Sequence, residues 1–147
     1  MSLISKSCEY GLRATLYIAA RRGDDYVSIR DISRDLDISF HFLTKILQKL
    51  TQHGILKSYR GPSGGVALAR PVKSVSLLDV VQAIEDRELF TSCVLGLNEC
   101  GEKTPCPLHA QWAQERARIQ RMFRGTTLDK LAKPIAEGTL RLGERFF

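Results

Sequence analysis

Three segments in the first half of the chain carry hydrophobic side chains at the three- and four-residue spacing of an α-helix. The pattern predicts a first helix over residues 6–22, a second that begins at Ser28 and ends before Asp37, and a third over residues 39–53. Ser28 is the expected N-cap of the second helix, and Asp31 is its expected capping-box partner. Because only a short turn separates the second and third helices, the pattern predicts a helix-turn-helix.

Two short apolar segments follow, over residues 55–60 and 66–69, joined by the sequence Gly-Pro-Ser-Gly-Gly. A linker of this composition is typical of a turn, so the two segments are predicted to form a β-hairpin, or wing. A fourth helix is predicted to begin at Ser76, with Asp79 as its capping-box partner.

The remainder of the chain is also predicted to be helical. A long helix is expected from Pro107 to about Arg124, and a short one begins at Thr127, with a loosely ordered tail beyond Gly138. Four large apolar side chains share one seam of the long helix: Leu108, Trp112, Ile119 and Met122. Such a seam fits packing between two subunits or within one chain, and periodicity leaves both open.

The positive charge is confined to the first half of the chain. Residues 1–75 contain 12 basic and 6 acidic side chains, whereas residues 76–147 contain 10 of each, so the net charge of +6 lies in the first half. No acidic residue occurs from Ile38 to Leu78, the segment that holds the third helix and the wing. A basic face can be merely solvated, but the absence of acid over this length favours a polyanion as partner.

The third helix presents polar and basic side chains opposite its apolar stripe, as a DNA recognition helix requires. An arginine beside a glycine-rich wing tip can enter the minor groove of DNA. A solvated helix face and a plain hairpin turn would explain these features separately, but their order within one basic segment favours binding to double-stranded DNA. The candidate DNA-binding residues are Arg30, Ser39, Phe40, His41, Thr44, Lys45, Lys49, Arg60, Ser63, Gly64 and Gly65.

Three of the four cysteines, Cys93, Cys100 and Cys106, lie close together in the sequence, and His109 follows them. Several thiolates on one loop are the ligands that iron–sulfur clusters and zinc prefer. The gaps of six and five residues favour a cluster, because structural zinc sites usually have closely spaced cysteine pairs. A structural zinc site and a thiol switch remain alternatives. A disulfide of a secreted protein is disfavoured, since no signal peptide is apparent.

Other classes of protein find less support in the sequence. No apolar run is long enough to span a membrane, and without a signal peptide a cytoplasmic location is expected. No paired catalytic carboxylates or nucleophile–base pair is apparent, and the wing sequence lacks the Lys-Ser/Thr of a phosphate-binding loop, so an enzyme is not expected. A protein-interaction adaptor is a further class, which tight, salt-sensitive DNA binding would exclude.

Three motifs occur in the order found in the Rrf-type bacterial repressors, a family that includes the IscR and NsrR regulators and the cluster-free CymR. The sequence resembles this family over about residues 1–133. The motifs are Ile4-Ser5-Lys6 with Glu9-Tyr10-Gly11-Leu12-Arg13-Ala14, then Arg60-Gly61-Pro62-Ser63-Gly64-Gly65, then Cys93, Cys100 and Cys106-Pro107-Leu108-His109 with Trp112.

The resemblance implies a mainly α fold, a winged helix-turn-helix with a two-stranded β wing and a long C-terminal dimerisation helix. A homodimer would bind a pseudo-palindromic operator and repress transcription. The three cysteines would hold an iron–sulfur cluster, of two or four irons, whose response to redox, nitric oxide or iron status tunes DNA affinity. The fourth ligand would be His109, as in IscR-like members, or Glu9 of the other subunit, as in NsrR-like members. Cys8, beside Glu9, is a further candidate.

These expectations divide the chain into four parts. Residues 1–90 form the winged helix-turn-helix DNA-binding domain, and residues 91–106 form the cysteine-rich, cluster-binding loop. Residues 107–133 form the dimerisation helix and the short helix after it, and residues 134–147 form the C-terminal tail. One departure from the family concerns the gap between Cys93 and Cys100, which is one residue longer than in its best-known members.

Overall fold

The computed structural model describes residues 3–21, 25–85, 90–98 and 100–144. The described part is mainly α-helical, with one antiparallel pair of strands, as predicted. Its elements, in chain order, are α1 (Lys6–Ala20), α2 (Ile29–Leu36), α3 (Phe40–Gln52), β1 (Leu56–Tyr59), β2 (Gly65–Leu68), the 3₁₀ turn η1 (Val72–Ser74), α4 (Leu77–Ile84), α5 (His109–Gly125) and α6 (Leu128–Ala136).

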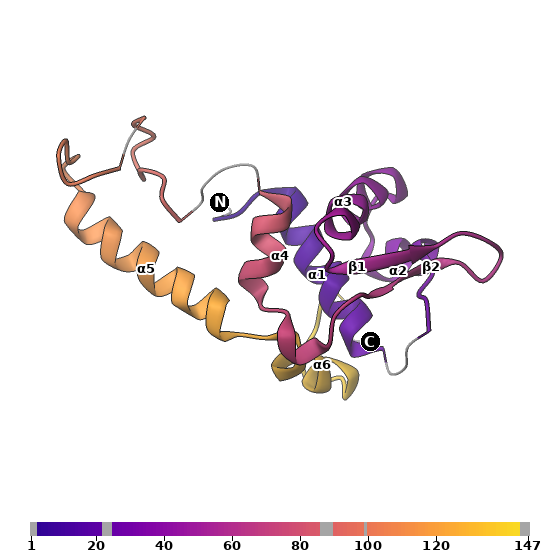
Figure 1. The fold of residues 1–147 in the computed structure, drawn as a ribbon. Helices are drawn as coiled ribbons and strands as arrows, with labels where there is room; N and C mark the ends of the chain where they lie inside the picture. Colours follow the sequence, from indigo (N-terminus) through magenta and orange to yellow (C-terminus); the bar gives the residue numbers. More distant parts are fainter. Residues whose placement is uncertain (1–2, 22–24, 86–89, 99, 145–147) are drawn as a thin grey trace.

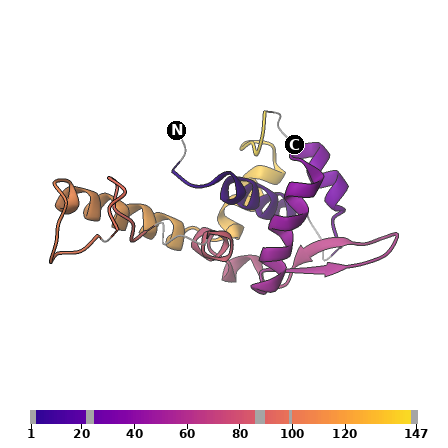
Figure 2. The same cartoon turned by 90° about the horizontal axis from the view of Figure 1, so that it is seen from above.

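The molecule has a helical body from which two elements project in opposite directions. Helices α1 to α4 and α6 form the body, and the hairpin β1–β2 extends from one side of it (Figure 1). Helix α5 extends from the other side and carries the cysteine loop, residues 91–106, at its far end; the view from above agrees (Figure 2). None of the described helices is long and apolar enough to cross a membrane.

Helix α1 lies at the centre of the body. It packs against α3, α4 and α6, and its buried face includes Cys8, Ala14 and Ile18. Gly11 is the point of closest approach, because a Cβ added there would lie 2.1 Å from Cδ1 of Ile84 and 3.1 Å from Cγ2 of Ile46. The glycine therefore allows α1 to pack directly against α3 and α4.

The predicted helix-turn-helix is present. Asp37 ends α2 in the left-handed conformation, with φ of 53°, and the next residue, Ile38, is buried. Gly54 follows α3 with φ of 73°, as expected of a glycine just after a helix. The isoleucine and leucine side chains of the turn and of both helices form the core beneath them: Ile32, Leu36, Ile38, Leu43, Ile46, Leu47 and Leu50.

One of the two predicted capping boxes is present. The Ser76 side chain accepts a hydrogen bond from the Asp79 backbone, and the Asp79 carboxylate accepts one from the Ser76 backbone. Ser28 is the N-cap residue of α2, as predicted, but its capping box is absent, because the Ser28 side chain makes no capping hydrogen bond. Asp31 instead pairs with Arg34 on the same helix, at 3.0 Å, and its carboxylate is thereby engaged away from the helix end.

The wing is anchored to the body at its base. Strands β1 and β2 pair with Leu56 opposite Leu68, and Val66 forms a bridge with Val27, just before α2, through two backbone hydrogen bonds of 2.8 and 2.9 Å. This bridge ties the wing to the start of the helix-turn-helix. The wing therefore has a fixed position relative to α2 and α3.

The C-terminal end of α5 packs against the body. Phe123 is buried and its ring contacts that of Phe90, with centroids 5.9 Å apart, while Ile119 is partly buried against the same core. The predicted seam is divided between different environments. The indole of Trp112 contacts the cysteine loop, and Leu108 and Met122 are 40% and 58% exposed.

The chain returns to the body after α5. Leu128 N donates to Val75 O at 2.9 Å, and α6 packs against α1 and η1. The prediction of a loosely ordered tail is wrong for residues 139–144, because Leu142 is buried and its carbonyl accepts a hydrogen bond from Arg13 Nε. Residues 145–147 lie outside the described part of the chain.

We predict that Gly11→Ala lowers the stability of the protein. Alanine is the better helix former by about 1 kcal/mol, but its methyl group would overlap the Ile84 side chain, and overpacking of this kind costs about 1–3 kcal/mol. Urea unfolding followed by circular dichroism measures the difference. Gly125→Ala is the matched control, because a Cβ there meets nothing within 4 Å. Equal stability of the two variants would refute the close packing at Gly11.

Candidate nucleic-acid interface and cysteine site

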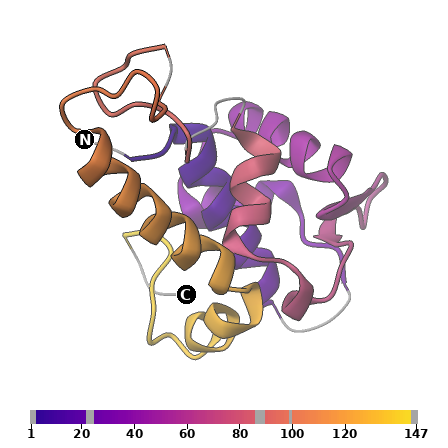
Figure 3. The same cartoon turned by 60° about the vertical axis from the view of Figure 1, so that its left-hand side comes forward.

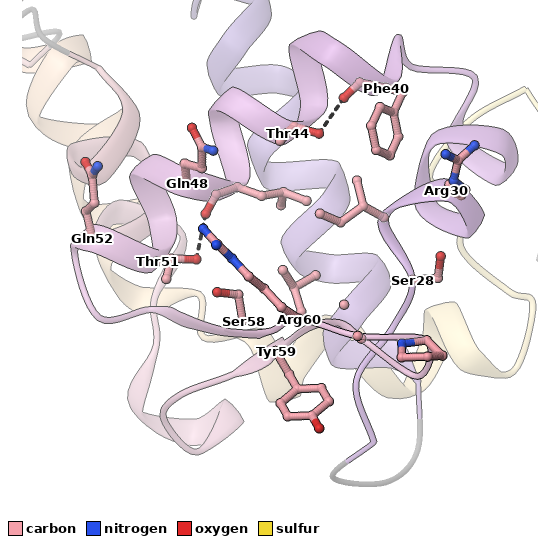
Figure 4. A pocket seen from close by; sticks show the side chains of 17 residues that line it. Ser28, Arg30, Phe40, Thr44, Gln48, Thr51, Gln52, Ser58, Tyr59 and Arg60 are labelled. Atoms are coloured by element: carbon pink, nitrogen blue, oxygen red, sulfur yellow. Dashed lines mark hydrogen bonds between the residues drawn. The ribbon is translucent and has the colours of Figure 1, made fainter.

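A groove of about 760 Å³ separates α3 from the wing. We call it the α3–wing groove; its walls are α3, the start of α2, and the hairpin (Figure 4). None of its described lining residues is acidic. The polar side chains that line it are Ser28, Arg30, Thr44, Gln48, Thr51, Gln52, Ser58, Tyr59 and Arg60.

Six of the predicted DNA-binding residues line this groove: Arg30, Phe40, Thr44, Arg60, Gly64 and Gly65. Phe40 begins α3 and is 41% exposed, and the guanidinium of Arg30 lies over its ring, 5.3 Å from the centroid. Figure 4 shows the Arg60 side chain pointing from the wing into the groove. Basic, amide and aromatic side chains therefore face one concave surface.

The other five predicted residues lie outside the groove lining. Ser39, His41 and Lys45 are exposed at or near the start of α3, and Ser63 is exposed at the wing tip. Lys49 differs from these, because its Nζ donates to the backbone carbonyl of Ile84, at the end of α4, at 3.3 Å. This lysine is directed toward α4, since its position on α3 lies at the border between the groove face and the core.

Six polar residues that line the groove were not among the predicted DNA-binding residues: Ser28, Gln48, Thr51, Gln52, Ser58 and Tyr59. Thr51 could have been found from its spacing, because it follows Thr44 and Gln48 at the four- and three-residue intervals of one helix face. Ser28 and Ser58 carried no comparable signal, since they reach the groove only through the bridge that joins the wing to the body.

The wing glycines are required by the hairpin itself. A Cβ at Gly64 would lie 2.4 Å from the carbonyl oxygen of Tyr59, and a Cβ at Gly65 would lie 2.0 Å from that of Val27. Gly61 adopts φ of 134°, which other residues rarely adopt. The geometry of the hairpin turn is therefore enough to explain these glycines. Their presence does not by itself indicate that the wing tip approaches DNA.

The cysteine loop folds back toward the start of α5, where Cys100 meets His109 and Cys93 meets Cys106. Cys100 Sγ lies 3.4 Å from Nδ1 of His109, and it accepts a hydrogen bond of 3.1 Å from Arg116 Nη1. The Cys93 and Cys106 thiols lie close enough for each to shift the pKa of the other. All four cysteines of the chain are free thiols, and no disulfide joins them.

Backbone amides surround the sulfur of Cys93. Hydrogen bonds from the backbone of Leu97 above all, and also of Leu95 and Gly96, hold the pKa of this thiol below its ordinary value. Gly96 has φ of 75°, which lets the loop turn around the sulfur. Burial raises the pKa of Cys106, and its contact with Cys93 raises it further. A curl of amides that favours a thiolate is a common setting of cysteine ligands in metal and cluster sites.

The two N-terminal candidate ligands lie apart from this loop within the chain. Cys8 is buried in the core, and burial together with the nearby carboxylate of Glu85 raises its pKa to about 12. It is therefore a neutral thiol at physiological pH. Glu9 lies in the first turn of α1, where it forms an ion pair with Lys6 at 3.1 Å.

The donor set at the loop, thiols with an imidazole, is of the kind that both an iron–sulfur cluster and a zinc ion take. Among the described residues, no three His, Cys, Asp or Glu side chains converge closely enough to hold one metal ion. A tetrahedral zinc ion needs such convergence, with sulfur ligands about 2.3 Å from the metal. An iron–sulfur cluster also takes thiolate ligands and accepts hydrogen bonds at its sulfurs, so the thiols and amides of this loop are compatible with either group.

Most of the chain matches a known family of regulators. The Rrf2 family, described as iron-dependent transcriptional regulators, matches residues 4–134. The IscR regulator of Vibrio campbellii is 32% identical over 133 residues, covering 90% of this chain and 78% of that protein.

Solved structures agree with the fold. CymR of B. subtilis, titled the global cysteine regulator, aligns with a TM-score of 0.75 and 26% identity, over 90% of this chain and 97% of CymR. T. potens IscR aligns with a TM-score of 0.74 and 22% identity, over 98% and 96% of the two chains, and so supports the fold alone. The chain belongs to the Rrf2 family of winged-helix transcriptional regulators.

Proposed function

We propose that the protein is a homodimeric, cytoplasmic repressor that binds pseudo-palindromic operators in double-stranded DNA. The observation that carries the proposal is the α3–wing groove, which is concave, free of acidic side chains and rich in arginine, amide and hydroxyl groups. A helix of this kind fits the major groove, and a hairpin beside it reaches the neighbouring minor groove or phosphates.

The groove residues suggest a division of roles. Gln48 and Arg30 carry the side-chain types that read adenine and guanine edges, and the exposed ring of Phe40 suits contact with a thymine methyl group. Lys45 and His41, which are exposed outside the groove, suit contact with phosphates. Ser39 and Ser63 lie at the helix start and at the wing tip, where they could also meet the DNA backbone.

We further propose that Cys93, Cys100 and Cys106 hold an iron–sulfur cluster. His109 is the candidate fourth ligand, because it already contacts Cys100. Cys8 is a poor candidate within its own chain, since it is buried in the body, and Glu9 could act only from a second subunit. When bound, the cluster would supply a centre whose state responds to redox conditions, nitric oxide or iron supply.

Helix α5 connects the body, which holds the α3–wing groove, to the cysteine loop. Its C-terminal end packs on the body and its N-terminal end carries the cysteine loop, as Figure 3 shows. The exposed Leu108 and Met122 suit a contact with α5 of a second subunit. A change in the loop would then alter the spacing of two recognition helices, which must match half-sites about one DNA turn apart.

The alternative is a thiol switch on the same DNA-binding fold, with structural zinc as a further possibility. The contact between Cys93 and Cys106 favours the switch, because two thiols in contact can be oxidised to a disulfide. The structural similarity to CymR, a cysteine regulator by its title, also favours the thiol switch. Metal and sulfide content separates these alternatives from a cluster.

The arginine of the wing provides a test of the interface. We expect Arg60→Ala to weaken binding to an operator selected from random duplexes by about 10- to 100-fold, the cost of losing one specific arginine contact. Fluorescence anisotropy measures the affinity. Arg118→Ala, on the exposed side of α5, should bind as the unaltered protein does. Operator affinity that is unchanged in Arg60→Ala would remove the wing from the interface.

Two lysines of α3 should differ in their salt dependence. We expect Lys45→Ala to reduce the slope of log affinity against log salt by about 1, as loss of one phosphate contact does. Lys49→Ala should leave the slope unchanged, because that ammonium group is directed at α4. The reverse result would mean that α3 faces DNA with a different side.

The cluster is tested by purifying the protein without oxygen and measuring its visible spectrum, iron and sulfide. We expect a coloured protein with matching iron and sulfide, and loss of both in Cys100→Ser. Operator affinity should differ between the cluster-loaded and cluster-free forms. A colourless protein that takes up no iron on reconstitution would favour the thiol switch or zinc, and zinc analysis would then decide between those two.

A further inference from the structure

One face of α5 holds both arms of the cysteine loop. Trp112 Nε1 donates to the backbone carbonyl of Ser92 at 2.8 Å, and Arg116 Nη1 donates to the same carbonyl at 3.0 Å. The same Arg116 nitrogen donates to Cys100 Sγ at 3.1 Å. His109, Trp112 and Arg116 follow one another at three- and four-residue intervals and so share this face.

The charge of Arg116 is directed at the thiol. In the described part of the chain, no salt bridge joins Arg116 to a carboxylate, whereas Arg118, two residues away, pairs with Glu115 at 3.4 Å. Arg116 is also half-buried, and Arg118 is exposed. Water therefore screens the Arg116 guanidinium less, and its nearest acceptors are the Cys100 sulfur and the Ser92 carbonyl.

An arginine cannot itself be a metal ligand, because its guanidinium has donors only and stays charged. It can hold a ligand in place, and a positive charge or hydrogen bond near a thiolate alters the reduction potential of a bound cluster. The planar group of arginine also reaches two acceptors at once, which the point charge of lysine does less well.

We propose that Arg116 is a positioning residue of the cysteine site. It links Ser92, which precedes Cys93, to Cys100, and so closes the loop into the shape that presents its thiols together. It also places a positive charge beside the Cys100 sulfur. The role as a cluster-tuning group rests on the proposed function, whereas the role in closing the loop applies to the cluster-free protein as well.

The test compares four full-length proteins: the unaltered chain, Arg116→Gln, Arg116→Lys and, as the matched control, Arg118→Gln. On reconstituted protein, we expect Arg116→Gln to lose its cluster to a chelator about 10-fold faster or more, the usual effect of removing a group that supports a ligand. Its reduction potential should fall, because a lost positive charge no longer stabilises the reduced, more negative cluster. For Arg116→Lys, both the rate of cluster loss and the reduction potential should lie between those of Arg116→Gln and the unaltered chain. Arg118→Gln should match the unaltered chain in both.

The second arm uses metal-free, reduced protein and measures hydrogen exchange of the backbone over residues 91–106. We expect faster exchange in this loop in Arg116→Gln, with exchange in α1, α3 and α4 unchanged. Loop exchange equal to that of Arg118→Gln would overturn the proposal, whether or not the protein binds a cluster. Failure of the unaltered chain to take up iron would instead overturn the cluster assignment and the tuning role, and leave the loop-closing role to be decided by this arm.

Discussion

The direct packing of α1 against α3 and α4 at Gly11 determines where the other elements lie. Because no side chain separates the helices there, Ile46 of α3 and Ile84 of α4 meet the same point of α1. Helix α3 is thereby oriented toward the groove, and α4 provides the surface on which the C-terminal end of α5 rests. The opposite faces of α1 are covered by α6 and by the segment that contains Leu142.

The C-terminal end of α4 joins several of these elements. The Ile84 carbonyl accepts from Lys49 of α3, and the Glu85 carboxylate accepts hydrogen bonds from the backbone and side chain of Ser5, the N-cap of α1. The same carboxylate lies beside Cys8. One helix end therefore links the DNA-facing helix and the first turn of α1, and it does so close in sequence to the cysteine loop.

The sequence predicted those features that depend on neighbours along the chain. The helix-turn-helix, the hairpin and the Ser76 capping box are set by spacing, glycines and local hydrogen bonds, and they are present. The Ser28 capping box failed because Asp31 has a competing partner, Arg34, on the same helix. The direction of Lys49, the burial of Leu142 and the contact between Arg116 and Cys100 join residues far apart in the chain, so no local pattern could reveal them.

The position of the cysteine loop at the free end of α5 also bears on how this chain can change over evolutionary time. The packed core accepts insertions poorly, because each would displace close-packed side chains. A loop held on the face of a projecting helix lies away from that core, and surface loops tolerate a gain or loss of residues. The cysteine loop can therefore vary in length while the α3–wing groove on the opposite side of the body stays the same.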